Sequence, residues 1–280
     1  MSIELPEAKI LAEQMNEELR NKRVKCCHLE DYERLQRIGM LDKDMESFGQ
    51  LVHGKIESVT SRGNVIRVKL NNGMNLVLAP EYGGKLFYHT NKKTVPKKFH
   101  LKVDFNDDTV LTVGLASMGL IHALRDNDLN RSYVYRRDFN SDVASPIDEE
   151  FTFKHFSGLL ADNNRMLKSV LVGKDAVVVG LSNSAFQDIV YRAKLHPKRK
   201  ASELNKGESQ ALYDAIKLVL EERIRLKGKD QFCDLYGNQG GYTPTMGPNM
   251  KQQSCLICGT PVEKLSIGGG QVYFCPKCQV

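Results

Sequence analysis

Apolar residues recur at helical spacing close to the start of the chain. Between residues 6 and 22 they fall on one side of a helix, at Ala8, Leu11, Ala12, Met15 and Leu19. Pro6 stands in the first turn, where a missing N–H costs nothing because that group has no partner within the helix. The pattern predicts an amphipathic helix over residues 6–22.

From about residue 50 the pattern changes to short alternating segments that are typical of strands. Turn sequences separate them, at residues 71–73, 82–84 and 106–108. The predicted strands are LVHGKIESV, NVIRVKL, MNLVLA, KLFYH, FHLKVDF and TVLTVGL. Together with the first helix they predict an N-terminal domain over residues 1–137, built as a β-sandwich or a barrel.

A polar stretch with Pro146 follows and predicts a linker over residues 138–150. After it the apolar period becomes helical, in segments 151–160, 165–172, 185–194 and 207–227. This predicts a helical domain over 151–246 and a small module over 247–280, so the fold class is α+β with several domains. The apolar turn 177–183 joins two helices. Amides at its end suit a phosphate, although Asn183 is equally well explained as a helix N-cap.

Composition and charge narrow the class of protein. With 280 residues and 41% hydrophobic content, the chain can bury the cores of two domains beside a small metal module. It contains no apolar run near the roughly 18 residues of a membrane span, and its start lacks the features of a secretory signal, so we expect a cytoplasmic protein without membrane contact. The net charge of +6 gathers partly in residues 92–98 and 192–200. Such clusters attract phosphate, but they also occur on ordinary solvated faces.

The strongest chemical signal is a set of four cysteines in the pattern C-x2-C-x16-C-x2-C, namely Cys255, Cys258, Cys275 and Cys278. This spacing is typical of a structural zinc ribbon, and the glycines at 268–270 suit the tip of a tight hairpin between the two pairs. We therefore expect one structural Zn2+. The alternative is two disulfides. The remaining cysteines, Cys26, Cys27 and Cys233, show no framework spacing and are interpreted as ordinary reduced thiols.

Several motifs together resemble a known family over nearly the whole chain. They are ELPE at 4–7, VVVGLSN ending at Asn183, YRAKLHPKRKASEL, DLYGNQGG at 234–241, and CGTPVEKL with FCPKCQ around the cysteines. Their order and spacing are similar to those of the formamidopyrimidine-DNA glycosylase and endonuclease VIII family. The resemblance implies a helix packed on a β-sandwich, a helix–two-turn–helix domain, a zinc hairpin and double-stranded DNA bound between the main domains. It also implies base-excision repair at damaged bases or abasic sites, by a monomer that associates with the bacterial nucleoid.

The family's chemistry requires an amine at the mature N-terminus, which attacks C1′ of the damaged nucleoside and forms a Schiff base that leads to β- or β,δ-elimination. The family's proline position is Ile3 here, preceded by Ser2, whose small size favours removal of Met1. Ser2 and Ile3 are therefore the candidate nucleophiles. Glu4 matches the residue that transfers protons at the sugar, and Glu7 matches one that lines the base pocket. Capping of the first helix is the alternative role for both acids.

Other DNA-facing positions depart from the family. Its hairpin lysine becomes Asn64, its arginine loop becomes residues 114–119, and its zinc-hairpin arginine becomes Gly270. Asn183 is retained and Asp188 replaces a glutamate. Further candidate DNA contacts are Arg62, Lys264 and Met118, which either wedges into the base stack or packs in the core.

Two functions follow from these residues. The first is a DNA glycosylase with abasic-site lyase activity that uses the N-terminal amine and Glu4. The second is a protein of the same architecture that binds damaged DNA without cutting it. Retention of ELPE favours the enzyme, because a binding protein has no need of both acids.

Overall fold

The computed structural model describes residues 3–42 and 44–280. The chain forms two compact units, of which the first contains the residues up to Ser141 together with Leu226–Gly241. The second contains Asp142–Arg225 and Tyr242–Val280. The first boundary falls within the predicted linker 138–150. Residues 226–241, however, belong to the first unit, whereas the sequence pattern groups them with the helical domain.

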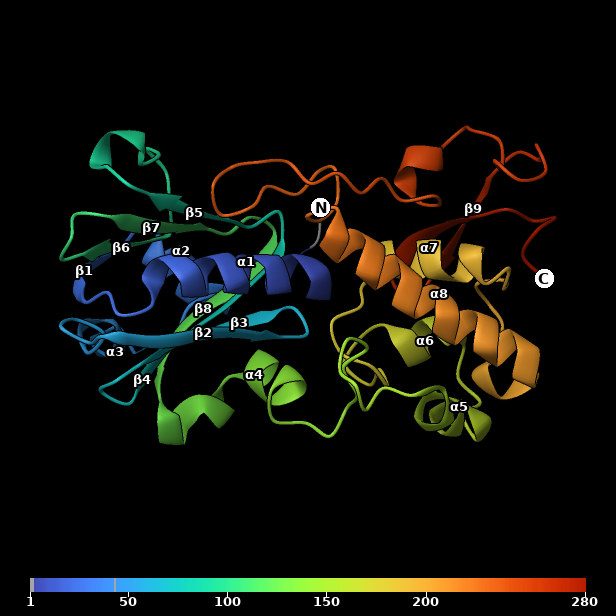
Figure 1. The fold of residues 1–280 in the computed structure, drawn as a ribbon, viewed down its shortest axis with the longest axis horizontal. Helices are drawn as coiled ribbons and strands as arrows, with labels where there is room; N and C mark the ends of the chain where they lie inside the picture. Colours follow the sequence, from blue (N-terminus) through green and yellow to red (C-terminus); the bar gives the residue numbers. More distant parts are fainter. Residues whose placement is uncertain (1–2, 43) are drawn as a thin grey trace. The chain divides into compact units, whose positions relative to one another are not determined.

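The first helix, α1, spans Leu5–Leu19 and confirms the predicted amphipathic helix (Figure 1). Its N-cap is Glu4, and a reciprocal pair of hydrogen bonds between Glu4 and Glu7 forms a capping box. It ends because Arg20 leaves the helical region and Asn21 takes a positive φ of 71°. Its apolar face, from Ala8 to Leu19, is buried in the core of the first unit.

Two antiparallel four-stranded sheets make up the rest of this unit's core. One has the order β1-β6-β7-β5, with bounds Val24–Leu29, Leu101–Phe105, Val110–Gly114 and Lys85–His89. The other has the order β2-β3-β4-β8, with bounds Ile56–Arg62, Val65–Leu70, Met74–Tyr82 and Met118–Arg125. The predicted β-sandwich is confirmed.

Three details of the strand prediction differ from the structure. The sequence pattern did not predict strands β1 and β8, because VKCCHL lacks clear alternation and MGLIHALR contains glycine and alanine, which do not favour strands. The segment 51–54, predicted as the start of a strand, is a turn in which His53 has a φ of 66°. Short helices complete the unit: α2 (Tyr32–Arg37), α3 (Glu46–Gly49), η1 (Lys92–Thr94), η2 (Asp126–Arg131) and α4 (Tyr133–Asp138).

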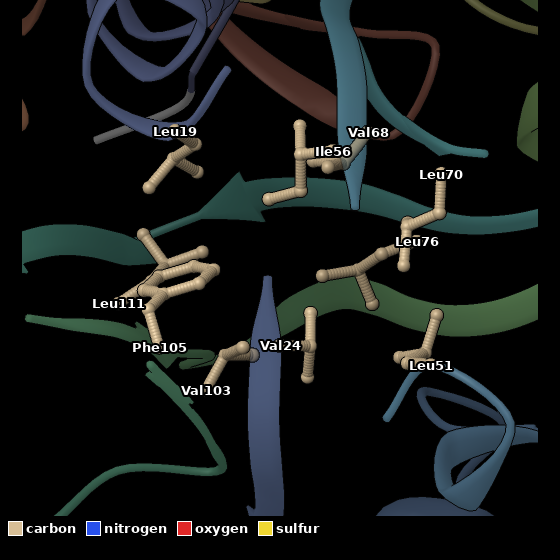
Figure 2. A pocket seen from close by; sticks show the side chains of 10 residues that line it. All are labelled: Leu19, Val24, Leu51, Ile56, Val68, Leu70, Leu76, Val103, Phe105 and Leu111. Atoms are coloured by element: carbon tan, nitrogen blue, oxygen red, sulfur yellow. The ribbon is translucent and has the colours of Figure 1, made fainter. Parts of the chain in front are cut away.

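Side chains from both sheets, α1 and the 49–54 turn meet in a single apolar core. Figure 2 shows ten of them around a small gap, from Leu19 of α1 to Phe105 of β6. The gap measures ≈ 20 Å³ and every residue around it is apolar, so it is a packing defect of the core and not a ligand site.

The segment 226–241 adds to this core. Phe232 and Leu235 are fully buried in it. The side chain of Gln14 holds the segment at two points, since its Nε2 donates to Asp234 Oδ2 at 2.9 Å and its Oε1 accepts from the Leu235 N–H at 3.0 Å. The DLYGNQGG motif is therefore a structural part of the sandwich unit.

The second unit combines helices with a hairpin. Its elements are α5 (Phe153–Ala161), α6 (Leu167–Leu171), α7 (Asn183–Arg192), η3 (Ala201–Glu203), α8 (Lys206–Arg225), η4 (Pro248–Met250), β9 (Glu263–Ile267) and β10 (Gly270–Phe274). Gly268 and Gly269 form the two-residue hairpin turn, with φ values of 51° and 74° that a turn of this kind requires. The predicted helices and hairpin are confirmed. Among the described residues, no helix has both the length and the apolar character of a membrane span.

Candidate functional site

The two carboxylates at the start of α1 are deeply buried, with Glu4 1% and Glu7 0% exposed. Glu7 holds the surrounding main chain, because its Oε2 accepts from the Glu4 N–H at 3.1 Å and its Oε1 accepts from the Lys229 N–H at 3.2 Å. The Lys229 side chain completes the group, with Nζ 3.6 Å from Glu4 Oε2. Two acids and one amine thus form a buried cluster within the first unit.

Close packing of glycines fixes the segment that carries Lys229. A Cβ atom on Gly240 would stand 2.3 Å from the Gly228 carbonyl oxygen and 2.4 Å from that of Lys229. Gly228 itself has a φ of 91°. Sequence reasoning missed Lys229, because the residue lies more than 200 positions from its partners and only its place just before DLYGNQGG marks it.

Ile3 is part of the core and not of an exposed terminus. Its side chain is 2% exposed and its main-chain N–H donates to the Glu81 carbonyl at 2.9 Å. This contact fixes Ile3 beside β4. Ser2, the other candidate nucleophile, lies outside the described residues.

Asn64 lies in a polar cluster with Glu81, Arg137 and Asp138. Its Nδ2 donates to Glu81 Oε1 at 3.3 Å, and its Oδ1 accepts from Arg137. Arg137 also contacts Glu81 at 3.3 Å and Asp138 at 2.6 Å. Burial disfavours its charge, but the hydrogen bond and charge of Asp138, together with Glu81, outweigh burial and raise the pKa of the guanidinium. A cation therefore lies beside Asn64, but two carboxylates neutralise it.

Arg62 and Met118 have different environments. The Arg62 guanidinium donates to the main-chain carbonyl of Asp138 and, at 3.5 Å, to that of Ser141. Met118, at the start of β8, is 55% exposed and pairs with Tyr82, which is 51% exposed. The prediction that Met118 packs in the core is therefore wrong. Met118 and Tyr82, the residue after Glu81, form an exposed apolar pair.

In the second unit, Asn183 is the first residue of α7, and the N-cap is Ser182, whose side chain accepts from the Ser184 N–H. Asn183 Nδ2 donates to the Gln271 carbonyl of the hairpin at 2.7 Å. Its Oδ1 is buried, with no hydrogen-bond partner among the described residues. The N-cap interpretation of Asn183 is thus wrong, because the side chain joins the helix to β10.

Asp188 has a structural role further along α7. It is 1% exposed and accepts hydrogen bonds from the Tyr242 hydroxyl and from the Thr245 and Met246 N–H groups. Lys264 is exposed on β9 opposite Tyr273, four residues before Gly268 of the hairpin turn.

Lys168 of α6 is a cation that sequence reasoning missed. It is 5% exposed, and its Nζ donates to the Ile267 carbonyl at 2.5 Å. A Cβ atom on Gly270 would stand 3.0 Å from this nitrogen and 3.6 Å from Asn183 Nδ2. Burial lowers the pKa of Lys168. The hairpin carries no arginine at Gly270, and the amine of Lys168 from α6 lies next to that position instead. No motif marks Lys168, so only the packing of α6 on the hairpin reveals it.

The four C-terminal cysteines bring their sulfur atoms within 4.8 Å of one another. Cys255 and Cys278 are 3.8 Å apart at sulfur, and Cys258 and Cys275 are 3.5 Å apart. Four thiolates around a tetrahedral Zn2+ stand about 3.8 Å apart, whereas a disulfide needs about 2.05 Å. Hydrogen bonds with the side chain and main chain of Thr260 lower the pKa of Cys258 to about 6. The disulfide alternative is wrong, since all four are free cysteines, and the donor set fits zinc.

Comparisons with known proteins agree with this architecture. The sequence model described as the formamidopyrimidine-DNA glycosylase N-terminal domain matches residues 3–114, and the one described as the H2TH domain of the same glycosylase matches residues 143–232. A formamidopyrimidine-DNA glycosylase of Bacillus cereus is 27% identical over 241 residues, covering 84% of this chain and 85% of the relative. That of Ligilactobacillus salivarius is 24% identical, covering 99% and 98%.

Solved structures of the Lactococcus lactis enzyme have the same fold. Its complex with DNA containing N7-benzyl-Fapy-dG superposes with a TM-score of 0.85 at 21% identity, covering 99% of both chains. Its complex with abasic-site DNA gives a TM-score of 0.84 at 21% identity, again covering 99% of both chains. The structures show the fold, and the two matched domain models together with the sequence relatives show that the chain belongs to the formamidopyrimidine-DNA glycosylase family.

Proposed function

We propose that this protein is a DNA glycosylase of base-excision repair that also cleaves the strand at the resulting abasic site. Its substrate is double-stranded DNA that carries a damaged base or an abasic site, and its place of action is the bacterial nucleoid in the cytoplasm. The buried cluster of Glu4, Glu7 and Lys229 carries this proposal, because it places a carboxylate and an amine together at the start of α1. A protein that only binds DNA has no use for this costly burial of charge.

Glu4 is the proton-transfer group in this proposal. Displacement of a base from C1′ requires a proton on the departing base, and the later elimination requires removal of a proton from C2′. A carboxyl group serves both steps in turn. Glu7 is a positioning residue, since its two oxygens bind the main-chain N–H groups of Glu4 and Lys229.

An amine attacks C1′ as the base leaves, and the opened sugar becomes an iminium whose C3′–O bond breaks after loss of the C2′ proton. The first candidate is the terminal amine of Ser2, freed by removal of Met1. The Ile3 N–H binds the Glu81 carbonyl, so an amine on Ser2 begins one residue upstream of this anchored point. The second candidate is Lys229 Nζ, which contacts Glu4 directly and becomes nucleophilic once its proton passes to that carboxylate.

DNA is held by groups in both units. Exposed Met118 and its neighbour Tyr82 form the apolar pair that enters the stack where a base is extruded. Asn183 and Lys168 bind backbone phosphates in the second unit, and exposed Lys264 adds a salt-sensitive contact. Arg62 and Asn64 act indirectly, because both are engaged with the Arg137–Asp138 segment.

One structural Zn2+ is bound by Cys255, Cys258, Cys275 and Cys278. The ion supplies folding free energy to the hairpin and takes no part in the reaction. These residues hold β9 and β10 in the arrangement that Lys168 and Asn183 contact.

Borohydride trapping tests the proposal. A duplex with a single abasic site is incubated with the protein, reduced, digested and mapped by mass spectrometry, with an intact duplex as the control. We expect a covalent adduct on the abasic duplex alone, and the modified peptide identifies the N-terminal amine or Lys229 as the nucleophile. Tight binding of the abasic duplex with no adduct and no strand cleavage would contradict the enzyme and favour the binding protein.

A further inference from the structure

A second group of potential metal ligands lies on the outer face of the sandwich, remote in the sequence from the four C-terminal cysteines. Cys26 and His28 belong to β1, an edge strand, and Asp104 belongs to the neighbouring strand β6. Cys26 pairs with Asp104 in the strand register, and His28 pairs with Lys102. All three side chains therefore project from the same side of the sheet.

A β-bulge creates this arrangement. The register shifts between Val24 and Cys26, so that Val24 pairs with Phe105 and Cys26 pairs with Asp104. Without the extra residue, Cys26 would face the core as Val24 does, because residues two apart share a face. With it, Cys27 packs against the core instead, and Cys26 and His28 face outward. The bulge is the reason that sequence inspection finds only isolated thiols here.

The three ligand atoms already have the spacing of ligands around one ion. Cys26 Sγ lies 3.2 Å from His28 Nε2 and 3.4 Å from Asp104 Oδ2, and His28 Nε2 lies 3.3 Å from the same oxygen. Zinc–ligand distances of about 2.0–2.3 Å at tetrahedral angles give ligand separations of about 3.4–3.6 Å. Each edge of the triangle is within a few tenths of an ångström of that range.

We propose that Cys26, His28 and Asp104 form a second metal site, which takes a divalent cation of the zinc class and leaves its fourth position to water. One sulfur, one nitrogen and one oxygen donor favour a borderline cation over Mg2+ or Ca2+, which prefer oxygen ligands. Solvent reaches the site through His28, whose side chain is 51% exposed, whereas Asp104 is 6% exposed at its side chain. Binding releases the thiol proton of Cys26 to solvent and forms the metal–sulfur bond.

Lys102 sets the affinity of this site. Its Nζ lies 3.1 Å from Asp104 Oδ2, the oxygen that the ion would share, and so repels a cation at this point. The ammonium has a second favourable neighbour, because the Phe99 ring centroid is 6.0 Å away. The site is therefore weaker than the four-cysteine site, and removal of the Lys102 charge strengthens it. A bound ion would also link the edge strand β1 to β6 through side chains, in addition to the main-chain hydrogen bonds that already join the two strands.

Cobalt titration of the full-length, zinc-loaded protein tests the site, because Co2+ bound to a thiolate absorbs visible light and total metal content is measured independently. We expect wild-type protein to bind one equivalent of Co2+ in addition to its structural Zn2+, as a second equivalent of metal. Cys26→Ser and His28→Ala should each weaken this second equivalent by at least about tenfold, since each removes a ligand. Lys102→Met should tighten it roughly tenfold by removing a like charge. Cys233→Ser, a partly buried cysteine of the same unit, is the matched control and should bind as wild type does.

His28→Ala keeps the test decisive if Cys26→Ser folds poorly, because an exposed histidine tolerates replacement. A wild-type protein that binds a single equivalent would overturn the proposal. So would a second equivalent that His28→Ala leaves unchanged, or one that Cys233→Ser removes. None of these results bears on the DNA glycosylase function.

Discussion

Lys168 Nζ lies 3.0 Å from the point at which a Cβ atom on Gly270 would stand. The absence of a side chain at Gly270 therefore leaves room for an ammonium that comes from another element, α6. The hairpin has no cationic side chain at Gly270, but a buried lysine amine from α6 lies beside the same position and near Asn183. The basic group at this point therefore comes from a residue that is distant in the sequence but close in space.

The closeness of Lys168 and Gly270 predicts that a basic side chain at either position can serve as the DNA contact. Lys168→Ala should weaken binding of abasic-site DNA by about tenfold, the cost of one charged hydrogen bond, and should lower the salt dependence by about one phosphate contact. The double variant Lys168→Ala, Gly270→Arg should restore much of the DNA affinity and of the salt dependence, because the alanine at position 168 leaves room for the arginine. Fluorescence anisotropy at several salt concentrations measures the two effects. Lys174→Ala, an exposed lysine of the same unit, is the control. Failure of the double variant to recover any affinity would argue against Lys168 as a phosphate contact.

A second prediction separates chemistry from binding at the first helix. Glu4→Gln keeps the shape of the side chain but cannot accept a proton, so strand cleavage should fall by about 10²-fold or more while DNA affinity stays unchanged. Single-turnover cleavage and anisotropy measure the two quantities. Glu17→Gln, on the exposed face of the same helix, should leave both at wild-type values. Equal loss of binding and cleavage would instead indicate that Glu4 acts only through the fold.

The ion pair between Lys229 and Glu4 predicts a non-additive effect on stability. Lys229→Met removes the ammonium beside a buried carboxylate and should lower the free energy of unfolding by about 3–5 kcal/mol. Adding Glu4→Gln removes the charge of that carboxylate, so the double variant should be more stable than Lys229→Met alone. Urea unfolding of the single and double variants completes the cycle. Simple additivity would mean that the two side chains do not interact energetically.

Removal of a zinc ligand should affect binding more than chemistry. Structural zinc contributes on the order of 10 kcal/mol in small isolated modules, so Cys275→Ser should unfold the hairpin locally. We expect loss of one zinc equivalent and weaker DNA binding, with borohydride trapping still detectable at high protein concentration. Metal analysis and anisotropy provide the measurements. Zinc loss without any change in DNA affinity would contradict the role assigned to the hairpin.

Local patterns allowed much of this structure to be predicted. Three features depend on residues close together in the chain and could be predicted from the sequence. They are the helical period of α1, the turn glycines at 268 and 269, and the spacing of the four cysteines. The acids Glu4 and Glu7 could be named because they belong to one short motif. The roles assigned to Ser2, Ile3, Arg62, Asn64, Met118, Asn183 and Lys264 in catalysis or DNA binding remain predictions.

The residues that escaped prediction depend on contacts between distant segments. Lys229 meets Glu4 across more than 200 positions, and Lys168 reaches Ile267 across 99. Periodicity carries no information about such pairs, since it describes one element at a time. The outward turn of Cys26 has a different cause, because a single inserted residue in β1 reverses which side chains face the core.

The return of residues 226–241 to the first unit has a practical consequence for dissecting the molecule. A fragment that stops at Ser141 would lack Phe232 and Leu235, both wholly enclosed among the apolar side chains of the sandwich, and would expose that interior to water. It would also leave Glu4 without its ammonium. One cut therefore cannot yield two self-sufficient pieces, because the first unit is complete only after residues 226–241, which follow α8 of the second unit in the chain, are in place.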